Sequence, residues 1–288
     1  MKISPLHKTV LAIAAPAVIE LILTSLTQLV DTVMVGHLGA YAISAVGLTG
    51  QPRFILLAVF IALNVGSTAL VARFRGQNDK KSAELVTAQA ILLTLAIAAI
   101  LTIPGIAFAR AMVVFMGAGS DTVEAATTYF RIMMLGFIPT ALPITISALL
   151  RGVGDTKIAM RYNITANVIN IVLNYLLIYG KAGFPALGVA GSAIATVIGN
   201  CAACAMALYA IAGKRFHRNG NHASDFIELK VTRRNCEPNP AMLSRILRVG
   251  LPSAAEQFAL RAGLLIYTVT NTSLGTKVFA AHQIVLAI

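Results

Sequence analysis

Two stretches of this sequence carry polar side chains at the spacing that places them on one face of a helix. The later stretch contains four amides at intervals of 4, 3 and 4 residues, Asn163, Asn167, Asn170 and Asn174. Successive helical residues are rotated by about 100°, so these amides fall within an arc of about 60°. The earlier stretch has the same intervals, with Glu20, Thr24, Thr27 and Asp31. Each stretch predicts a helix with one polar face, and the earlier face ends in a carboxylate.

The chemistry that these groups offer is the binding of a proton or a small hard cation. An ionised aspartate near the centre of a bilayer costs about 2.5–3.5 kcal/mol. No Lys or Arg lies in the same apolar stretch as Asp31 to offset that cost. Amide oxygens of Asn170 and Asn174, with the Thr196 hydroxyl, would complete a site for a small hard cation or organise a protonated carboxyl group. The sequence therefore predicts an ion site around Asp31, with metal binding only if the ion is a metal cation and not a proton.

Three further residues are candidates for lining the site. Glu20 and Thr27 lie on the earlier polar face, and Ser192 lies four residues before Thr196 on another apolar segment. The alternative is that the stripes only join helices through hydrogen bonds. That alternative suits Asn163 and Asn167 better than Asp31, because a hydrogen bond between helices needs no charge.

Long apolar segments must position these groups. Seven segments are long enough to cross a hydrocarbon core of about 30 Å as helices. They are approximately Val10–Val35, Phe54–Val71, Leu85–Ala109, Ile132–Leu150, Ile164–Tyr179, Val189–Ala212 and Leu247–Thr270, and another begins near His282. Their continuous apolar character favours helices over the alternating strands of a membrane barrel. We therefore expect an all-α integral membrane protein.

Composition and charge placement agree with a membrane location. Of 288 residues, 57% are hydrophobic and 12% are charged, which is about half the charged fraction of a soluble domain. With the first residue in the cytoplasm, 17 Lys and Arg residues lie on the cytoplasmic side and four on the other. This bias predicts a multi-pass protein of the plasma (cell inner) membrane with a cytoplasmic N-terminus. The placement of basic residues on the cytoplasmic side of the membrane accounts for the net charge of +12. We therefore expect no nucleic acid partner.

The chain also contains an internal repeat with an offset of 236 residues. Pro16 and Glu20 in the first apolar segment match Pro252 and Glu256 in the seventh, and Leu38–Gly39 matches Leu274–Gly275. Six helices separate the copies, so the repeats are parallel six-helix bundles. We expect an N-lobe at residues 1–213, a cytoplasmic linker at 214–245 and the start of a C-lobe at 246–288. On this interpretation the chain is a fragment that lacks roughly five helices.

The second copy does not reproduce the whole polar face of the first. Glu256 is retained as a second-lobe or interface acid, but Tyr267 stands at the position equivalent to Asp31. Arg261 follows Glu256 by five residues and either neutralises it or reaches towards an interface. The sequence therefore places the ion site in the first bundle.

Four segments in order resemble the multidrug and toxic compound extrusion family of antiporters. They are Val30–Gly39, Leu149–Lys157, Asn167–Asn174 and Gly188–Thr196. The resemblance covers essentially the whole chain and implies two six-helix lobes that face a central cavity. It also implies that Asp31 is the coupling carboxylate and that Asn170, Asn174 and Thr196 help to hold Na⁺ or organise the protonated acid. Some members carry an acid where Asn174 stands.

The resemblance leads us to expect secondary active efflux of organic, often cationic, compounds in exchange for Na⁺ or H⁺, by a monomer without a cofactor. A transporter of this kind is not expected to have enzyme activity. We expect no nucleotide binding either, because Arg151–Lys157 lacks the ending of a phosphate-binding loop and follows a helix. Two alternatives stay open. One is a lipid-linked sugar flippase of a related fold, and the other is a membrane assembly subunit that transports nothing.

Overall fold

The computed structural model describes residues 5–212 and 237–287, which are helical with short connections and no strand. Residues 214–236 of the predicted linker lie outside this part. The helices are α1 (Pro5–Gly36), α2 (Ala40–Gly76), α3 (Lys80–Ala107), α4 (Ala109–Phe115), α5 (Val123–Leu135), α6 (Phe137–Gly152), α7 (Thr156–Tyr179), α8 (Gly188–Ala212), α10 (Pro240–Thr272) and α11 (Thr276–Ala287). The expected all-α fold is confirmed for the described residues.

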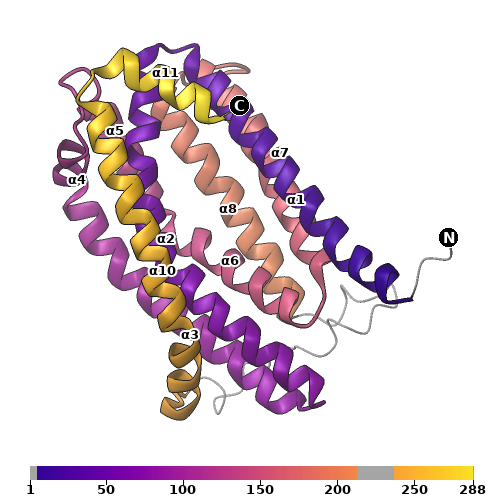
Figure 1. Cartoon of the computed structure of the whole chain (residues 1–288). Helices are drawn as coiled ribbons and strands as arrows, with labels where there is room; N and C mark the ends of the chain where they lie inside the picture. Colours follow the sequence, from indigo (N-terminus) through magenta and orange to yellow (C-terminus); the bar gives the residue numbers. More distant parts are fainter. Residues whose placement is uncertain (1–4, 213–236, 288) are drawn as a thin grey trace.

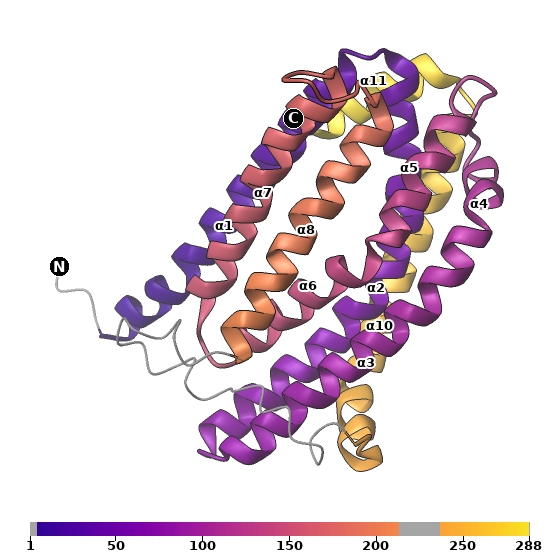
Figure 2. The ribbon, with the colours of Figure 1, turned by 180° about the vertical axis from the view of Figure 1, so that it is seen from behind.

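The long helices lie in two groups (Figures 1 and 2). α1, α7 and α8 lie side by side in one group, and α2, α3 and α10 form the other. α5 and α6 connect the groups, because both contact α2 and α8. α1 packs mainly on α7 and touches its other neighbours much less. The polar faces predicted from the sequence therefore lie on adjacent helices.

Four described helices are long and apolar enough to cross a membrane, and α5 and α6 together meet the same criterion as one bent span. The four are residues Ala14–Gly36 of α1, and the helices α2, α3 and α8. α7 and α10 have 24 and 33 residues, which is sufficient length, but they are too polar for that criterion. The amide stripe explains the lower apolarity of α7. Its polar face is covered by α1 and α8, so its lipid exposure is limited.

The predicted fourth span is broken at Gly136, where α5 and α6 meet at 55°. A Cβ at this residue would lie 2.4 Å from Cγ2 of Val197 on α8. Pro139 occupies the first turn of α6, where the missing N–H has no helical partner to lose. Glycine therefore permits the close approach of α8, and the proline fits the restarted helix. The break therefore precedes Pro139.

Other helix boundaries differ from the apolar segments. α2 begins at Ala40, well before the predicted apolar segment that starts at Phe54, and it continues through Pro52 without a break. α10 begins at Pro240, where the Asn239 side chain accepts a hydrogen bond from the Met242 N–H at 3.1 Å. Asn at the N-cap and Pro at the first position both favour a helix start. The last residues of the predicted linker are therefore helical.

The turns before α2 and α11 have the same form. Gly39 and Gly275 have φ values of 117° and 99°, a region that glycine enters without the steric cost of a Cβ. They are 236 residues apart, and each directly precedes its helix. This local likeness has the same offset as the sequence repeat.

Candidate ion-coupling site

The centre of the site is a carboxylate on α1 that faces an amide on α7. Nδ2 of Asn174 donates a hydrogen bond to Oδ1 of Asp31 at 2.5 Å. Asn174 is fully buried. Near the ends of the same two helices, the Tyr179 hydroxyl donates to the carbonyl oxygen of Met34 at 2.9 Å. These contacts hold the second half of α1 against α7.

Close packing of α8 on α7 brings Thr196 beside Asn170. Gly191 and Gly199 of α8 permit this approach, because a Cβ would lie 2.6 Å from the carbonyl oxygen of Leu177 at the first and 2.8 Å from that of Ala166 at the second. Asn170 and Thr196 are then joined by a 3.0 Å hydrogen bond. The small residues of α8 therefore complete the predicted group of Asp31, Asn170, Asn174 and Thr196.

The Asn170 amide can be placed in two orientations that exchange its oxygen and nitrogen, and the second satisfies its neighbours better because the first sets the amide oxygen against the carboxylate oxygens of Asp31. In the first, Nδ2 donates to Thr196 Oγ1, and Oδ1 accepts from Asn174 at 3.3 Å. In the second, the nitrogen donates to both carboxylate oxygens of Asp31, at 3.0 and 3.1 Å, and the oxygen accepts from Thr196 Oγ1 at 3.0 Å. The partners of an amide decide which end is nitrogen. An ionised Asp31 selects the second orientation, because a carboxylate only accepts hydrogen bonds.

The site has one negative charge, and no Lys or Arg of the described residues forms an ion pair with it. Within the described part of the chain the ion pairs are Lys80–Glu84 and Arg151–Glu20, and neither includes Asp31. Oδ1 of Asn174 is buried without a hydrogen-bond partner. An unpaired amide oxygen next to a carboxylate is a suitable ligand for a hard monovalent cation. The group can therefore take up one positive charge, either as a metal ion or as a proton.

The other candidate residues are not part of this cluster. The Thr27 hydroxyl donates to the carbonyl oxygen of Leu23 on its own helix at 2.9 Å. Ser192 contributes its backbone carbonyl, which accepts from Thr196 Oγ1 at 3.0 Å. Glu256 is exposed and makes no hydrogen bond or ion pair to another described residue. The guanidinium carbon of Arg261 lies 4.7 Å from the ring centroid of Phe54, so Arg261 does not neutralise Glu256.

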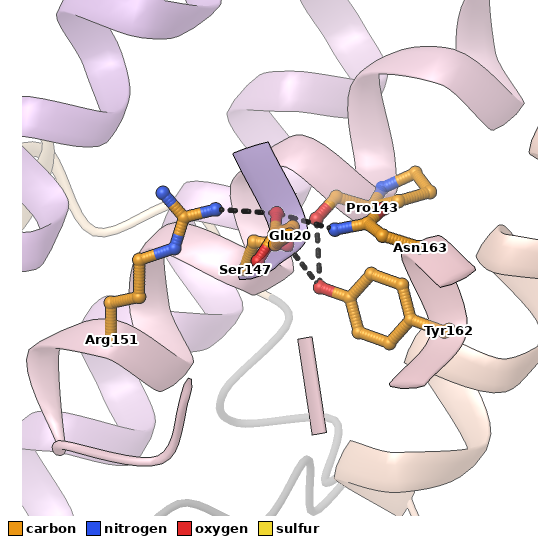
Figure 3. A network of polar contacts seen from close by, with 6 residues as sticks. All are labelled: Glu20, Pro143, Ser147, Arg151, Tyr162 and Asn163. Carbon is orange, nitrogen blue, oxygen red and sulfur yellow. Dashed lines mark hydrogen bonds and ion pairs between the residues drawn. The ribbon is translucent and has the colours of Figure 1, made fainter. Parts of the chain in front are cut away.

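A second polar network lies three turns along α1, towards its N-terminus (Figure 3). Oε1 of Glu20 accepts from Nδ2 of Asn163 at 2.8 Å and from Nη2 of Arg151 at 3.2 Å. Beside it, the Tyr162 hydroxyl bonds with Ser147 and donates to the carbonyl oxygen of Pro143 at 3.1 Å. Glu20 thus belongs to this network and does not line the Asp31 site.

The sequence did not predict the Glu20–Arg151 pair. The reason is that α6 extends to Gly152 and carries Arg151 in its last turn, far from Glu20 in the chain. The identical 4, 3, 4 spacing of the two polar faces was a signal for the Glu20–Asn163 contact, but no sequence pattern links Glu20 with Arg151. The following helix is capped by Asp155, whose Oδ1 accepts from the Ile158 N–H at 3.4 Å.

Comparisons with known proteins agree with this geometry. The MatE family model matches residues 16–176. A curated relative, the probable multidrug resistance protein NorM of Thermotoga maritima, is 28% identical over 98% of this chain and 58% of its own length. Solved inward-facing and outward-facing structures of a multidrug resistance MATE family transporter align with TM-scores of 0.77 and 0.79, at 28% and 27% identity.

These alignments leave a large part of the relatives unmatched. The inward-facing alignment covers 89% of this chain and 55% of the solved chain, and the outward-facing alignment covers 95% and 58%. The chain therefore spans a little over half the length of the proteins it matches.

Proposed function

Because the chain belongs to the MatE family, we propose that it serves in secondary active multidrug efflux, exporting organic and often cationic compounds in exchange for Na⁺ or H⁺. The ion binds at Asp31, with Asn170, Asn174 and Thr196 as its neighbours. The protein acts in the plasma (inner) membrane as a monomer with a cytoplasmic N-terminus. Positive residues favour that orientation by 17 to four. This substrate class is supported by relatives that are named as probable multidrug resistance proteins.

The observation that carries the proposal is a carboxylate bound by amides without a basic partner. Asn174 donates to Asp31 at 2.5 Å, and the ion pairs of the described residues lie elsewhere. A carboxylate that serves only to hold helices together would be stabilised by an arginine or lysine. An amide shell leaves the charge available for an ion that arrives and departs.

The two orientations of Asn170 provide a response to that ion. When Asp31 is ionised and empty, the amide nitrogen faces it and donates to both oxygens. When a cation or a proton occupies the carboxylate, the amide oxygen is the better neighbour, and the nitrogen donates to Thr196 instead. The Asn170 amide thus changes partners as the site fills. This exchange makes two hydrogen-bonded states available from the same set of side chains.

The membrane potential supplies part of the driving force. One elementary charge that enters the cell across about −100 mV contributes roughly 2.3 kcal/mol. That energy corresponds to a gradient of roughly 50-fold in an exchanged neutral compound, since about 1.4 kcal/mol is a factor of ten. An export cycle that exchanges one entering cation for a neutral compound therefore gains this energy before any ion gradient is added, whereas a one-for-one exchange for a monovalent cationic compound moves no net charge and depends on the ion gradient.

The test is efflux of a fluorescent organic cation from proteoliposomes that contain the full-length protein, with Na⁺ and pH gradients imposed separately. We expect one gradient to drive efflux in the native protein and Asp31→Asn to abolish it. Glu84→Gln is the matched control, because Glu84 forms an ion pair only with Lys80 on its own helix.

The outcomes of this test separate the candidate functions. Gradient-driven efflux that depends on Asp31 supports the antiporter and identifies its ion. Equal efflux from native protein and Asp31→Asn would move coupling to another site. No efflux from the native protein under either gradient would contradict the proposal and favour the flippase or the assembly subunit.

A further inference from the structure

The polar faces of α1 and α7 meet at the same levels along both helices. Glu20 bonds with Asn163, and Asp31 bonds with Asn174, and in each pair the residue numbers differ by 143. The two pairs are eleven residues apart, which is a rise of roughly 16 Å and a rotation of only about 20° from three full turns. α1 and α7 are therefore parallel and in step over three turns, with a carboxylate–amide pair at each end.

The two intermediate positions also share the same levels. Thr24 is opposite Asn167, and Thr27 is opposite Asn170, because the 4, 3, 4 intervals are identical on both helices. No hydrogen bond joins α1 to Asn167 among the contacts of the described residues, and the Thr27 hydroxyl bonds within its own helix. Among the described residues, the hydrogen bonds between the paired faces therefore involve Glu20 and Asp31, which stand at the two ends of the polar face of α1.

A ladder of identical amides does not determine by itself how far α1 is displaced along α7. Asp31 now lies beside Asn170 and Asn174. A shift of about one turn towards the N-terminus of α7 would place it beside Asn167 and Asn170 instead, which are amides of the same kind. In a bilayer, apolar side chains gain little by leaving lipid for another helix, so polar contacts and close packing decide helix pairing. A single distinct partner at one end of the ladder removes this ambiguity.

Arg151 is that distinct partner. It lies in the last turn of α6 and donates to Glu20 at 3.2 Å, while Asn163 donates to the same oxygen. Figure 3 shows the Glu20 carboxylate between these two groups. The Tyr162 hydroxyl, next to Asn163 in the chain, bonds with α6 at Ser147 and Pro143. Arg151 is thus held at a fixed height relative to the amides of α7.

We propose that Glu20 is a positioning residue whose ion pair with Arg151 sets the axial register of α1 on α7, and thereby determines which amides Asp31 meets. This inference rests on the proposed function for its effect on transport. The register itself is a property of the helix pair. Glu20 does not touch the coupling ion, and it acts through the placement of Asp31 three turns away.

The exposure of the pair indicates what its loss should change. The Arg151 side chain is 47% exposed and that of Glu20 is 14% exposed. Ion pairs with such access to solvent contribute little to overall stability. We therefore expect Glu20→Gln to leave thermal unfolding nearly unchanged but to raise the half-saturating concentration of the coupling ion by roughly five-fold.

The first test measures the register directly by disulfide trapping in full-length protein from which Cys201, Cys204 and Cys236 have been replaced. Thr24→Cys with Asn167→Cys reports the observed register, because these positions lie at the same level. Thr27→Cys with Asn167→Cys reports a shift of about one turn that takes Asp31 towards the N-terminus of α7, because these positions differ by 140 residues instead of 143. We expect Glu20→Gln to lower the yield of the first disulfide and raise that of the second. Glu84→Gln, which breaks an ion pair on α3 alone, should change neither yield.

The second test uses charge reversal and the ion dependence of efflux. Glu20→Arg combined with Arg151→Glu restores the pair with opposite polarity, so we expect it to recover the native disulfide pattern and the native half-saturating ion concentration. Each single reversal should lose both. A merely structural role would lower the maximal rate or the amount of folded protein without changing the ion concentration needed.

Failure of this inference is distinguishable from failure of the proposed function. Unchanged disulfide yields in Glu20→Gln would overturn the inference, even if Asp31 proved essential for coupled efflux. Altered yields with no ion-coupled efflux in native protein would retain the register role and reject the transport function. Altered yields together with a raised ion requirement would support both.

Discussion

Gly191 of α8 lies so close to Leu177 of α7 that a Cβ on the glycine would be 2.6 Å from the leucine carbonyl oxygen. That atom belongs to the backbone, so a side-chain rotation cannot relieve the contact. The separation of α7 and α8 therefore depends on the absence of one methyl group. The same separation sets the 3.0 Å contact between Asn170 and Thr196.

Gly191→Ala should push α8 away from α7. We expect it to destabilise the protein by about 1–3 kcal/mol, the usual cost of overpacking, and to weaken ion binding by separating Thr196 from Asn170. Thermal unfolding in detergent and the ion dependence of efflux measure the two effects. Gly50→Ala is the control, since a Cβ there meets nothing within 4 Å. Equal behaviour of the two variants would contradict the packing argument.

Asn174→Leu should impair the ion site more than the same change elsewhere on the stripe. It removes the donor 2.5 Å from Asp31 and the buried oxygen beside it. Loss of a hydrogen bond to a buried charged group costs about 1.5–3 kcal/mol, so the half-saturating ion concentration should rise by at least ten-fold. Asn167→Leu on the same face is the matched control, because no described hydrogen bond joins Asn167 to α1. A similar rise in both variants would show that the effect is general to the stripe.

Gly136→Ala should strain the junction of α5 and α6. The added Cβ would lie 2.4 Å from Cγ2 of Val197, and we expect a loss of about 1–3 kcal/mol in unfolding free energy. Val197→Ala removes the opposing methyl groups, so the double variant should be more stable than the sum of the single effects predicts. Thermal unfolding of all four proteins gives this comparison. Strict additivity would place the strain elsewhere.

The sequence alone was sufficient to identify the polar faces and their chemistry. The 4, 3, 4 spacing placed Asn170 and Asn174 on one face, and the apolar surroundings of Asp31 indicated a carboxylate without a basic neighbour. Both inferences depend only on helical periodicity and the cost of charge in lipid. The cap at Asp155 was equally local, because the residue types at the start of a helix reveal it.

Contacts between distant helices were harder to predict. Glu20 was considered for the Asp31 site because it shares that helix face, but eleven residues of helix separate the two carboxylates by three turns. Its partner Arg151 lies 131 residues away, and no local pattern links them. The ends of the helices also differ from the ends of the apolar segments where a helix continues into more polar residues. α2, for example, includes Pro52, which lies before the predicted apolar segment.

The paired attachment of α1 has a mechanical consequence. A single hydrogen bond to α7 would leave α1 free to rotate about its own axis. The two hydrogen bonds at Glu20 and Asp31 resist both rotation of α1 and its displacement along α7. Between these two contacts, we expect α1 and α7 to move together as one rigid unit. A rotation of one helix should therefore rotate the other as well. We expect the surroundings of Asp31 to change when the α1–α7 pair moves against α8, or when either helix bends outside the segment between the two contacts.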